Sequence, residues 1–322
     1  MKAIVYTKYG SPDVLELKDI EKPVPQDDEV LVKIHAASLN AYDWHMLTAD
    51  IFLVRFAAGL MKPNNTLLGA DIAGVVEAVG SKVTQFKPGD EVFGEARHGC
   101  GGFAEYVCAR ENALVLKPVN CSFEQAAAVP MAAFTALQGL RDNGQIKAGQ
   151  KVLINGAGGG VGTFAVQLAK YFGAEVTAVC GTGNLDTARA SGADHVIDYT
   201  TQDFTKSGRQ YDLIFAANGY HWIFDYKRCL SDRGIYVTAG GTLSQLVQAL
   251  LLGPRISSSD GRKLGALSAK LNLEDLRFMK DLVETGKVKP VIDRSYPLAA
   301  TAQALRYLGK GHAKGKVIIT MQ

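Results

Sequence analysis

The sequence has few cysteines and no long hydrophobic run, and both absences narrow the class of protein. Its 322 residues contain five cysteines, an odd number without a Cys-x-x-Cys pair, which argues against a disulfide framework. No apolar run approaches the roughly 18 residues of a transmembrane helix. The first residues, Met1–Tyr6, already have the pattern of a strand rather than of a targeting segment. We therefore expect a cytoplasmic protein without an integral membrane segment.

Charge of one sign is also scarce. The formal net charge is only +3 and the basic residues are scattered, which gives no footprint for a nucleic acid and no polybasic membrane patch. Hydrophobic residues make up 47% of the chain, enough for two folded cores and too many for a disordered protein. The partners expected from these properties are small neutral or anionic ligands.

Glycine, in contrast, is abundant, and one group of glycines lies between a predicted strand and a predicted helix. The strand 151–156 leads into the turn 156–162, and the helix 163–173 and the strand 175–180 follow. In such a unit the glycines let the backbone approach a pyrophosphate, which binds the free N–H groups of the helix. The first glycine of the usual fingerprint is Ala157, so a flexible loop is the alternative. The flanking elements favour a dinucleotide site that uses Gly158, Gly159, Gly160 and Val161.

The pattern of short apolar runs predicts an α/β protein with two kinds of domain. Up to about residue 120, short runs separated by proline and glycine indicate a β-barrel-like domain, with runs at 30–34, 72–78, 91–93, 103–107 and 113–116. Later strands alternate with helices and predict a doubly wound parallel sheet, with strands at 151–156, 175–180, 195–199, 211–217, 234–239 and about 264–270. The last part has a helix at 273–285, an extended stretch at 288–296, a helix at 300–308 and a strand at 316–320. We expect domains at 1–120 and 121–271, and a return of 272–322 to the first domain.

Four motifs together resemble a known family. They are Gly69–Val76, Phe86–Gly94, Ala157–Gly162 and Gly192–Tyr199. They resemble the zinc-independent quinone oxidoreductases of the medium-chain dehydrogenase/reductase superfamily. Within these, the chain is most similar to bacterial NAD(P)-dependent reductases related to the chloroplast-envelope quinone oxidoreductase homologue. The resemblance covers nearly the whole chain and implies a GroES-like catalytic domain, a Rossmann domain and hydride transfer from a nicotinamide cofactor.

The resemblance also indicates where zinc-dependent relatives would hold their metal. Their ligands are a cysteine, a Gly-His-Glu segment and a later cysteine, and the matching places here are Ser38, Gly69–Asp71 and 131–133. A serine and a single aspartate cannot hold zinc tightly. Of the structural zinc lobe only Cys100, Cys108 and His98 remain, and ordinary loop and strand roles are the alternative for them. We expect no metal, and without a Lewis acid the suitable substrate is an activated acceptor, a quinone or an α,β-unsaturated carbonyl compound.

The segment Ser38–His45 resembles the part of the family that lies beside the nicotinamide. By this resemblance Asn40 donates to a substrate carbonyl or to the cofactor ribose, and Asp43 orients its neighbours; capping of a helix is the alternative for both. Tyr42 and His45 are the titratable candidates for a proton donor, although packing, surface exposure and a proton from solvent are alternatives. Thr135 resembles a family threonine beside the nicotinamide, or it bonds back to the preceding helical turn.

The residues after the second predicted Rossmann strand bear on the choice of cofactor. A site selective for NAD usually has an acid about 20 residues past the glycines, and none is present at Cys180–Asn184. NADPH is therefore favoured. The family's basic residue is replaced by Gly183, so NAD stays open. The expected cofactor contacts here are Gly181, Thr182, Gly183 and Tyr199, and Asn218 and Gly240 complete the set.

An apolar segment follows the Asn40 region at 47–66, and we interpret it as a wall or lid over a hydrophobic acceptor, with an ordinary core helix as the alternative. The function that we predict is zinc-independent, NAD(P)H-dependent reduction of a quinone or enone. The alternatives are a zinc-free carbonyl or diketone reductase and a non-catalytic nucleotide-binding scaffold. A homodimer formed through the sheet edge at 264–270 is a further expectation.

Overall fold

The computed structural model describes residues 1–241 and 243–321, and the chain forms two compact units. Unit 1 consists of Met1–Met131, Leu271–Gly286 and Pro290–Gln322, and unit 2 of Ala132–Lys270 and Lys287–Lys289. The C-terminal part of the chain therefore returns to the unit with which the chain begins.

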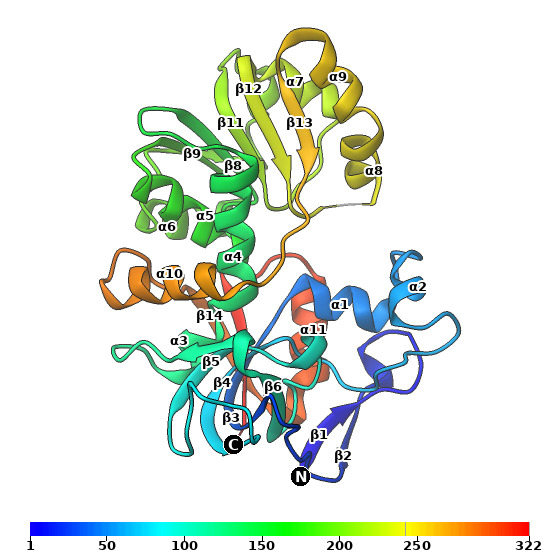
Figure 1. Cartoon of the computed structure of the whole chain (residues 1–322). Coiled ribbons are helices and arrows are strands. Elements are labelled where there is room, and N and C mark those ends of the chain that lie inside the picture. The colour runs from blue at the N-terminus through cyan, green and yellow to red at the C-terminus, as the bar shows by residue number, and fades with distance from the viewer. Residues whose placement is uncertain (242, 322) are drawn as a thin grey trace. The chain divides into compact units, whose positions relative to one another are not determined.

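Unit 1 is built on a seven-stranded, mostly antiparallel sheet (Figure 1). The strands run in the order β14-β15-β3-β4-β5-β7, with β6 also paired to β3, and β14 and β15 are parallel to each other. A separate hairpin joins β1 and β2. The bounds are β1 Lys2–Val5, β2 Glu16–Asp19, β3 Glu29–Leu39, β4 Asp71–Val79, β5 Glu91–Glu95, β6 Tyr106–Arg110, β7 Leu114–Leu116, β14 Ile292–Pro297 and β15 Lys316–Thr320.

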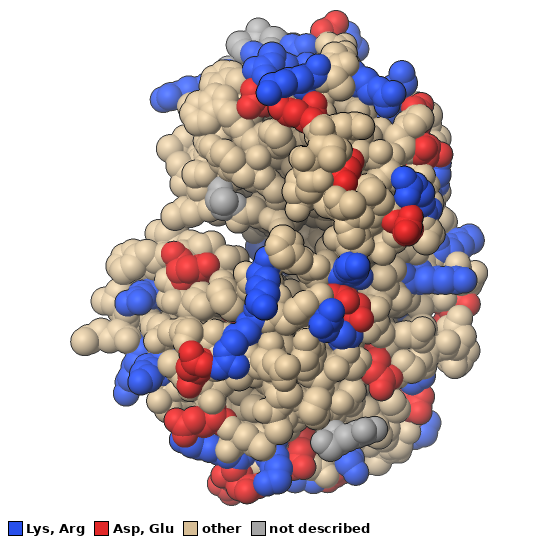
Figure 2. Space-filling view, turned by 180° about the vertical axis from the view of Figure 1, so that it is seen from behind, with Lys and Arg blue, Asp and Glu red and all other residues tan. Residues whose placement is uncertain are grey.

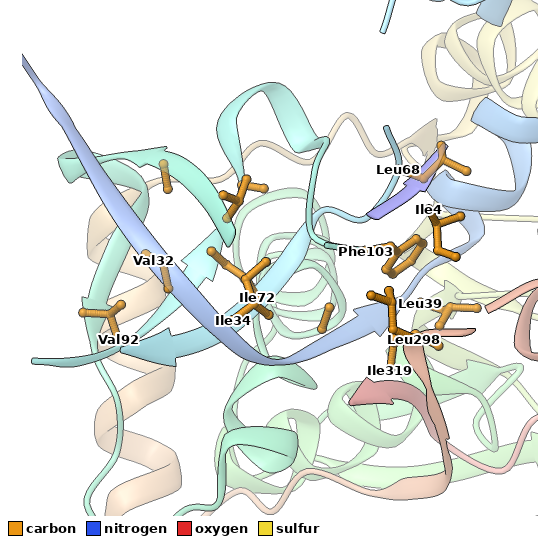
Figure 3. Packing of buried hydrophobic residues seen from close by; sticks show 14 of the residues in the cluster. Ile4, Val32, Ile34, Leu39, Leu68, Ile72, Val92, Phe103, Leu298 and Ile319 are labelled. Atoms are coloured by element: carbon orange, nitrogen blue, oxygen red, sulfur yellow. The ribbon is translucent and has the colours of Figure 1, made fainter. Parts of the chain in front are cut away.

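The α-helices that belong to this part of the fold are short apart from α10. They are α1 Ala41–Thr48, α2 Val54–Ala58, α3 Phe123–Ala127, α4 Pro130–Gln138, α10 Leu273–Glu284 and α11 Thr301–Gly309, and α4 continues into unit 2. Aliphatic side chains from β3, β4 and β15 fill the core, with Phe103 and Ile4 close together at one end (Figure 3). This packing fixes the strands whose ends carry the polar residues described below.

Unit 2 contains a six-stranded parallel sheet in the order β10-β9-β8-β11-β12-β13 (Figure 1). Numbered from its own first strand, this is the 3-2-1-4-5-6 order of a dinucleotide-binding fold. The strands are β8 Lys151–Asn155, β9 Glu175–Cys180, β10 His195–Asp198, β11 Tyr211–Ala216, β12 Leu230–Thr238 and β13 Lys263–Ala266. The helices are α5 Gly160–Tyr171, α6 Leu185–Ala190, α7 Ile223–Arg228, α8 Leu243–Leu251 and α9 Gly253–Asp260.

The predicted strands of unit 2 are all present, but some limits were wrong. The fifth strand begins at Leu230 rather than 234, and the sixth ends at Ala266 rather than 270 because Lys270 leaves the sheet and bonds to Gln138. In unit 1 the apolar run predicted at 103–107 starts earlier than the observed strand β6. Phe103 is outside the seven-stranded sheet, because its carbonyl accepts a hydrogen bond from Ile4 of the β1–β2 hairpin. The β13 strand lies at a sheet edge, as the dimer hypothesis requires.

Charged residues of both signs are mixed over the surface in Figure 2, in agreement with the low net charge. Within the described residues, no helix is both long and apolar enough to cross a bilayer.

Candidate active site

The turn from β3 into α1 brings the first predicted site residues together. Asn40 is the N-cap of α1, and the Asp43 carboxylate accepts hydrogen bonds from the backbone N–H groups of Asn40 at 2.8 Å and Gly69 at 3.0 Å. Asp43 is completely buried, and burial raises its pKa to about 7. Its observed contacts tie the start of α1 to the loop before β4.

The Asn40 side chain belongs to a buried polar network centred on Asp71. Asp71 Oδ2 accepts hydrogen bonds from Ser38 Oγ at 2.9 Å and Asn40 Nδ2 at 3.0 Å, and Asp71 Oδ1 accepts one from the Met131 N–H at 3.0 Å. Lys316, the first residue of β15, donates from Nζ to Asn40 Oδ1 at 2.5 Å and lies 3.4 Å from Asp71 Oδ2. We call Ser38, Asn40, Asp71 and Lys316 the Asp71 network.

The Asp71 network is an arrangement of opposite charges out of contact with water. Ser38 and Asp71 are completely buried, while Asn40 and Lys316 are 9% and 3% exposed. Burial lowers the pKa of Lys316, and the nearby carboxylates of Asp71 and Asp43 oppose this effect. Lys316 could not be recognised as a site residue from the sequence, because it lies 276 positions from Asn40 and begins an otherwise ordinary apolar strand.

A second group of titratable side chains lies beside Asp43 and Asp71. Tyr42 is half-buried, and burial together with Cys100 and Asp43 raises the pKa of its hydroxyl. Burial raises the pKa of the Cys100 thiol to about 11. Glu95, the last residue of β5, is the Cα partner of Asp71 in β4. Burial, and next the charges of Asp71 and Asp43, raise the Glu95 pKa to about 7. Glu95 was not among the residues singled out from the sequence.

The other predicted residues of this region have more ordinary surroundings. His45 Nδ1 lies 2.8 Å from Asp50 Oδ1, and both side chains are partly exposed. Thr135 is half-buried in α4, within unit 2. The structure brings Asn40, Tyr42 and Asp43 into one cluster, whereas His45 contacts Asp50 outside it.

The segment 47–66 contains the short helix α2 and presents apolar side chains to solvent. Phe52 is 58% exposed and Phe56 is 69% exposed, and their rings meet edge to face with centroids 5.6 Å apart. The exposure of these two phenylalanines does not fit the alternative of an ordinary core helix. The lid interpretation stays a prediction.

In unit 2 the glycine turn has the shape that a pyrophosphate site needs. Gly156 has φ +81°, and its N–H donates to the Val179 carbonyl of β9. Gly159 is the N-cap of α5, so Gly160 and Val161 lie in the first helical turn with their N–H groups directed out of the helix end. A Cβ on Gly162 would lie 2.1 Å from the Gly156 carbonyl oxygen, which only glycine allows. The residues present therefore fit a dinucleotide phosphate.

The remaining predicted cofactor residues of unit 2 follow the carboxyl ends of neighbouring strands. Asn218 follows β11, and its backbone N–H would lie 2.7 Å from a Cβ on Gly156. Gly240 follows β12, and its carbonyl accepts a hydrogen bond from Thr238. Asn184 packs over Gly158, and its buried side-chain oxygen has no hydrogen-bond partner among the described residues. Ligands bind at this edge of such sheets.

An acid that was not singled out from the sequence lies beside the corner after β9. Tyr199 lies against Gly181, since a Cβ there would be 3.1 Å from the Tyr199 hydroxyl. Thr182 Oγ1 donates to Asp198 Oδ2 at 2.6 Å, so this carboxylate lies beside Gly181–Gly183. Asp198 pairs with Cys180 in the register of β9 and β10. The acid comes from the neighbouring strand and not from the corner itself.

Comparisons with known proteins agree with both halves of the fold. The model of the alcohol dehydrogenase GroES-like domain matches residues 26–119, and that of the zinc-binding dehydrogenase domain matches residues 191–319. A chloroplastic quinone-oxidoreductase homologue from Spinacia oleracea is 36% identical over 338 residues, covering 99% of this chain and 98% of the relative. A chloroplastic NADPH-dependent alkenal/one oxidoreductase from Arabidopsis thaliana is 36% identical over 332 residues, covering 99% of this chain and 79% of the relative.

Solved structures give the same answer. The quinone oxidoreductase from Coxiella burnetii superposes with a TM-score of 0.87 at 31% identity, covering 100% of this chain and 99% of that one. The chain belongs to the medium-chain dehydrogenase/reductase superfamily, in the family of the quinone oxidoreductase homologues. This confirms the resemblance and the predicted fold class, a GroES-like domain with a Rossmann-type parallel sheet.

The name of one matching family model refers to zinc, but the residues present here do not fit this metal. Among the described residues, no group of three His, Cys, Asp or Glu side chains is arranged to hold a metal ion. The Asp71 network offers one carboxylate, and the Lys316 ammonium already pairs with it. Zinc needs three or four nitrogen, sulfur or carboxylate ligands. Cys100 lies beside Tyr42, whereas Cys108 lies near Glu29 and Arg97. The residues that remain of the structural zinc lobe therefore form no ligand set.

Proposed function

We propose that the protein is an NADPH-dependent reductase that transfers hydride to a quinone or to the β-carbon of an α,β-unsaturated carbonyl compound. The main observation in support is the combination of a dinucleotide turn at Gly156–Gly162 with a polar cluster in which Lys316 supplies the positive charge. The printed names of the spinach and Arabidopsis relatives, a quinone-oxidoreductase homologue and an alkenal/one oxidoreductase, support the same chemistry.

The acceptor class follows from what the residues can do. NADPH supplies the hydride when it is bound. The Lys316 ammonium is already bonded to Asn40 and Asp71 and so is not placed to polarise an ordinary ketone, whereas a quinone or enone delocalises the incoming charge itself. The protein then has to orient the acceptor and provide a proton. We assign pocket roles to Asn40 and Tyr42, with Asp43 holding the start of α1.

For the cofactor we favour NADPH over NADH. The proposed contacts are the N–H groups of Gly158–Val161 for the pyrophosphate and Gly181–Gly183 with Tyr199 for the 2′-phosphate, with Thr135, Asn218 and Gly240 nearer the nicotinamide ribose. The NADPH-dependent Arabidopsis relative supports this preference. Asp198 acts in the opposite direction, because its negative charge lies beside the same corner.

The test is oxidation of NADPH by 9,10-phenanthrenequinone and by an alkenone, each with and without a chelator. We expect turnover of at least one acceptor, unchanged by the chelator. Turnover of a diketone alone would favour a carbonyl reductase, and cofactor binding without turnover of any acceptor by folded protein would favour the non-catalytic scaffold. A tenfold preference for NADH would overturn the cofactor assignment.

Two further proposals concern the state of the protein in the cell. We propose a cytoplasmic location, which fractionation of expressing cells would test. We also propose a homodimer that pairs the β13 edges of two copies, since β13 is an edge strand. Light scattering of the purified protein measures the oligomeric state, and a monomer would overturn the dimer proposal.

A further inference from the structure

Glu95 differs from the other acids of its cluster because its carboxylate has no partner. Among the described residues it forms no hydrogen bond or ion pair, whereas Asp43 accepts two backbone hydrogen bonds and Asp71 accepts hydrogen bonds from four residues. Yet Glu95 is half-buried and stands directly opposite Asp71 in the register of β4 and β5. Two carboxylates facing each other across a ladder repel, so this placement is unfavourable for a purely structural residue.

The neighbours of Glu95 come from three elements. Asp71 faces it from β4, Asp43 and Tyr42 from α1, and Cys100 from the end of the loop after β5. Tyr42 interacts with the Cys100 thiol, and a Cβ on Gly99 would lie 3.3 Å from the Tyr42 hydroxyl, so this loop folds closely over Tyr42. The Lys316 ammonium is bonded to Asn40 and Asp71. The positive charge of the cluster is therefore used by Asp71, and Glu95 is left to carry a proton.

The other proton donors of the cluster are less suitable. The raised pKa values of Tyr42 and Cys100 make both groups weak acids at neutral pH. His45 Nδ1 lies 2.8 Å from Asp50 Oδ1, and its ring is partly exposed and outside the cluster around Asp43 and Asp71. Burial raises the pKa of both Asp43 and Glu95 to about 7, but both carboxylate oxygens of Asp43 already accept backbone hydrogen bonds, so Glu95 is the carboxyl group whose proton is transferable at neutral pH.

We propose that Glu95 is the proton donor of the reduction, giving its carboxyl proton to the acceptor as the hydride adds. This inference rests on the proposed function. The hydride leaves the dihydronicotinamide with its electron pair and forms a C–H bond at the β-carbon, or an O–H or C–H bond on a quinone, so the cofactor is oxidised and the acceptor is reduced. The resulting enolate or hydroquinone anion takes the proton of Glu95. The carboxylate that remains takes up a proton from solvent, since Glu95 is only half-buried.

The test compares Glu95→Gln with Glu91→Gln, a matched change at the exposed start of the same strand, where Glu91 pairs with Lys117. Alkenone reduction is followed from about pH 5 to about pH 9, with NADPH affinity and thermal melting as controls for folding. We expect kcat/KM of the natural protein to fall above about pH 7. Glu95→Gln should lose this dependence and about a hundredfold in kcat, which is within the range of general acid catalysis. Glu95→Asp should keep a pH dependence.

Two outcomes separate the proposal from the function beneath it. If the natural protein reduces the alkenone and Glu95→Gln matches Glu91→Gln in kcat and in pH profile, the role of Glu95 is wrong and the proposed function stands. If folded natural protein binds NADPH but reduces neither quinone nor alkenone, the proposed function fails, and the role of Glu95 fails with it.

Discussion

The replacement of Lys316 by methionine tests the Asp71 network most directly. Lys316 is 3% exposed and its Nζ lies 3.4 Å from Asp71 Oδ2, so the variant leaves a buried carboxylate without its counter-charge. Removal of one partner of a buried ion pair typically costs about 3 to 5 kcal/mol. Three other hydrogen bonds to Asp71, from Ser38, Asn40 and the Met131 N–H, remain. We therefore expect the lower end, about 3 kcal/mol of unfolding free energy.

The assay is urea unfolding of four proteins at neutral pH: the natural chain, Lys316→Met, Asp71→Asn and the double variant. Because the double variant has no unpaired buried charge, its loss should be smaller than the sum of the two single losses by about 1 to 3 kcal/mol. A loss below about 1 kcal/mol for Lys316→Met, or strictly additive losses, would refute the assignment of the ion pair as a desolvated unit.

Four further predictions follow from other parts of the structure. Burial raises the pKa of Glu95 from 4.5 to about 7, so the folded protein loses stability as pH rises through this window; Glu95→Gln should have no effect below pH 4.5 and stabilise by up to about 3 kcal/mol above pH 7 in pH-dependent urea unfolding. Asp198→Asn should raise the preference for NADPH over NADH severalfold in kcat/KM, and an unchanged ratio would show that this carboxylate does not meet the 2′-phosphate. Gly162→Ala should abolish NADPH binding in a fluorescence titration, because its Cβ would lie 2.1 Å from the Gly156 carbonyl oxygen. Phe52→Ser with Phe56→Ser should raise KM for long apolar acceptors but not for short ones, and equal KM values would contradict the lid interpretation.

Most of the parallel sheet could be predicted from the sequence because its strands are buried on both faces. Such strands are short continuous apolar runs, and the glycine turn identifies the first of them. The proposed cofactor residues could be predicted to lie together for a related reason, since the ends of parallel strands meet at one edge. The sequence failed at strand limits such as Leu230, where the early residues of β12 are polar and partly exposed.

Glu95 and Lys316 could not be predicted as members of the candidate site, because only the pairing of strands brings them to it. Glu95 reaches Asp71 only through the register of β4 and β5, and Lys316 reaches Asn40 only because β15 lies beside β3. Asp198 was within reach of sequence reasoning. It lies near the end of the third predicted strand, 195–199, and a parallel neighbour of the second strand had to place that end beside the corner Gly181–Gly183.

The balance of charges in the cluster connects the Asp71–Lys316 ion pair with the proton on Glu95. Two completely buried carboxylates, Asp43 and Asp71, and the half-buried Glu95 share one buried ammonium, that of Lys316. One ammonium neutralises one carboxylate, and its contacts select Asp71. The burial that raises the pKa of both Asp43 and Glu95 then keeps protons on the cluster near neutral pH. Asp43 is enclosed by backbone donors, so the proton that can leave is that of Glu95. A cluster of this kind can complete a hydride transfer by giving a proton. The acceptor itself must delocalise the negative charge that the hydride brings, as a quinone or enone does.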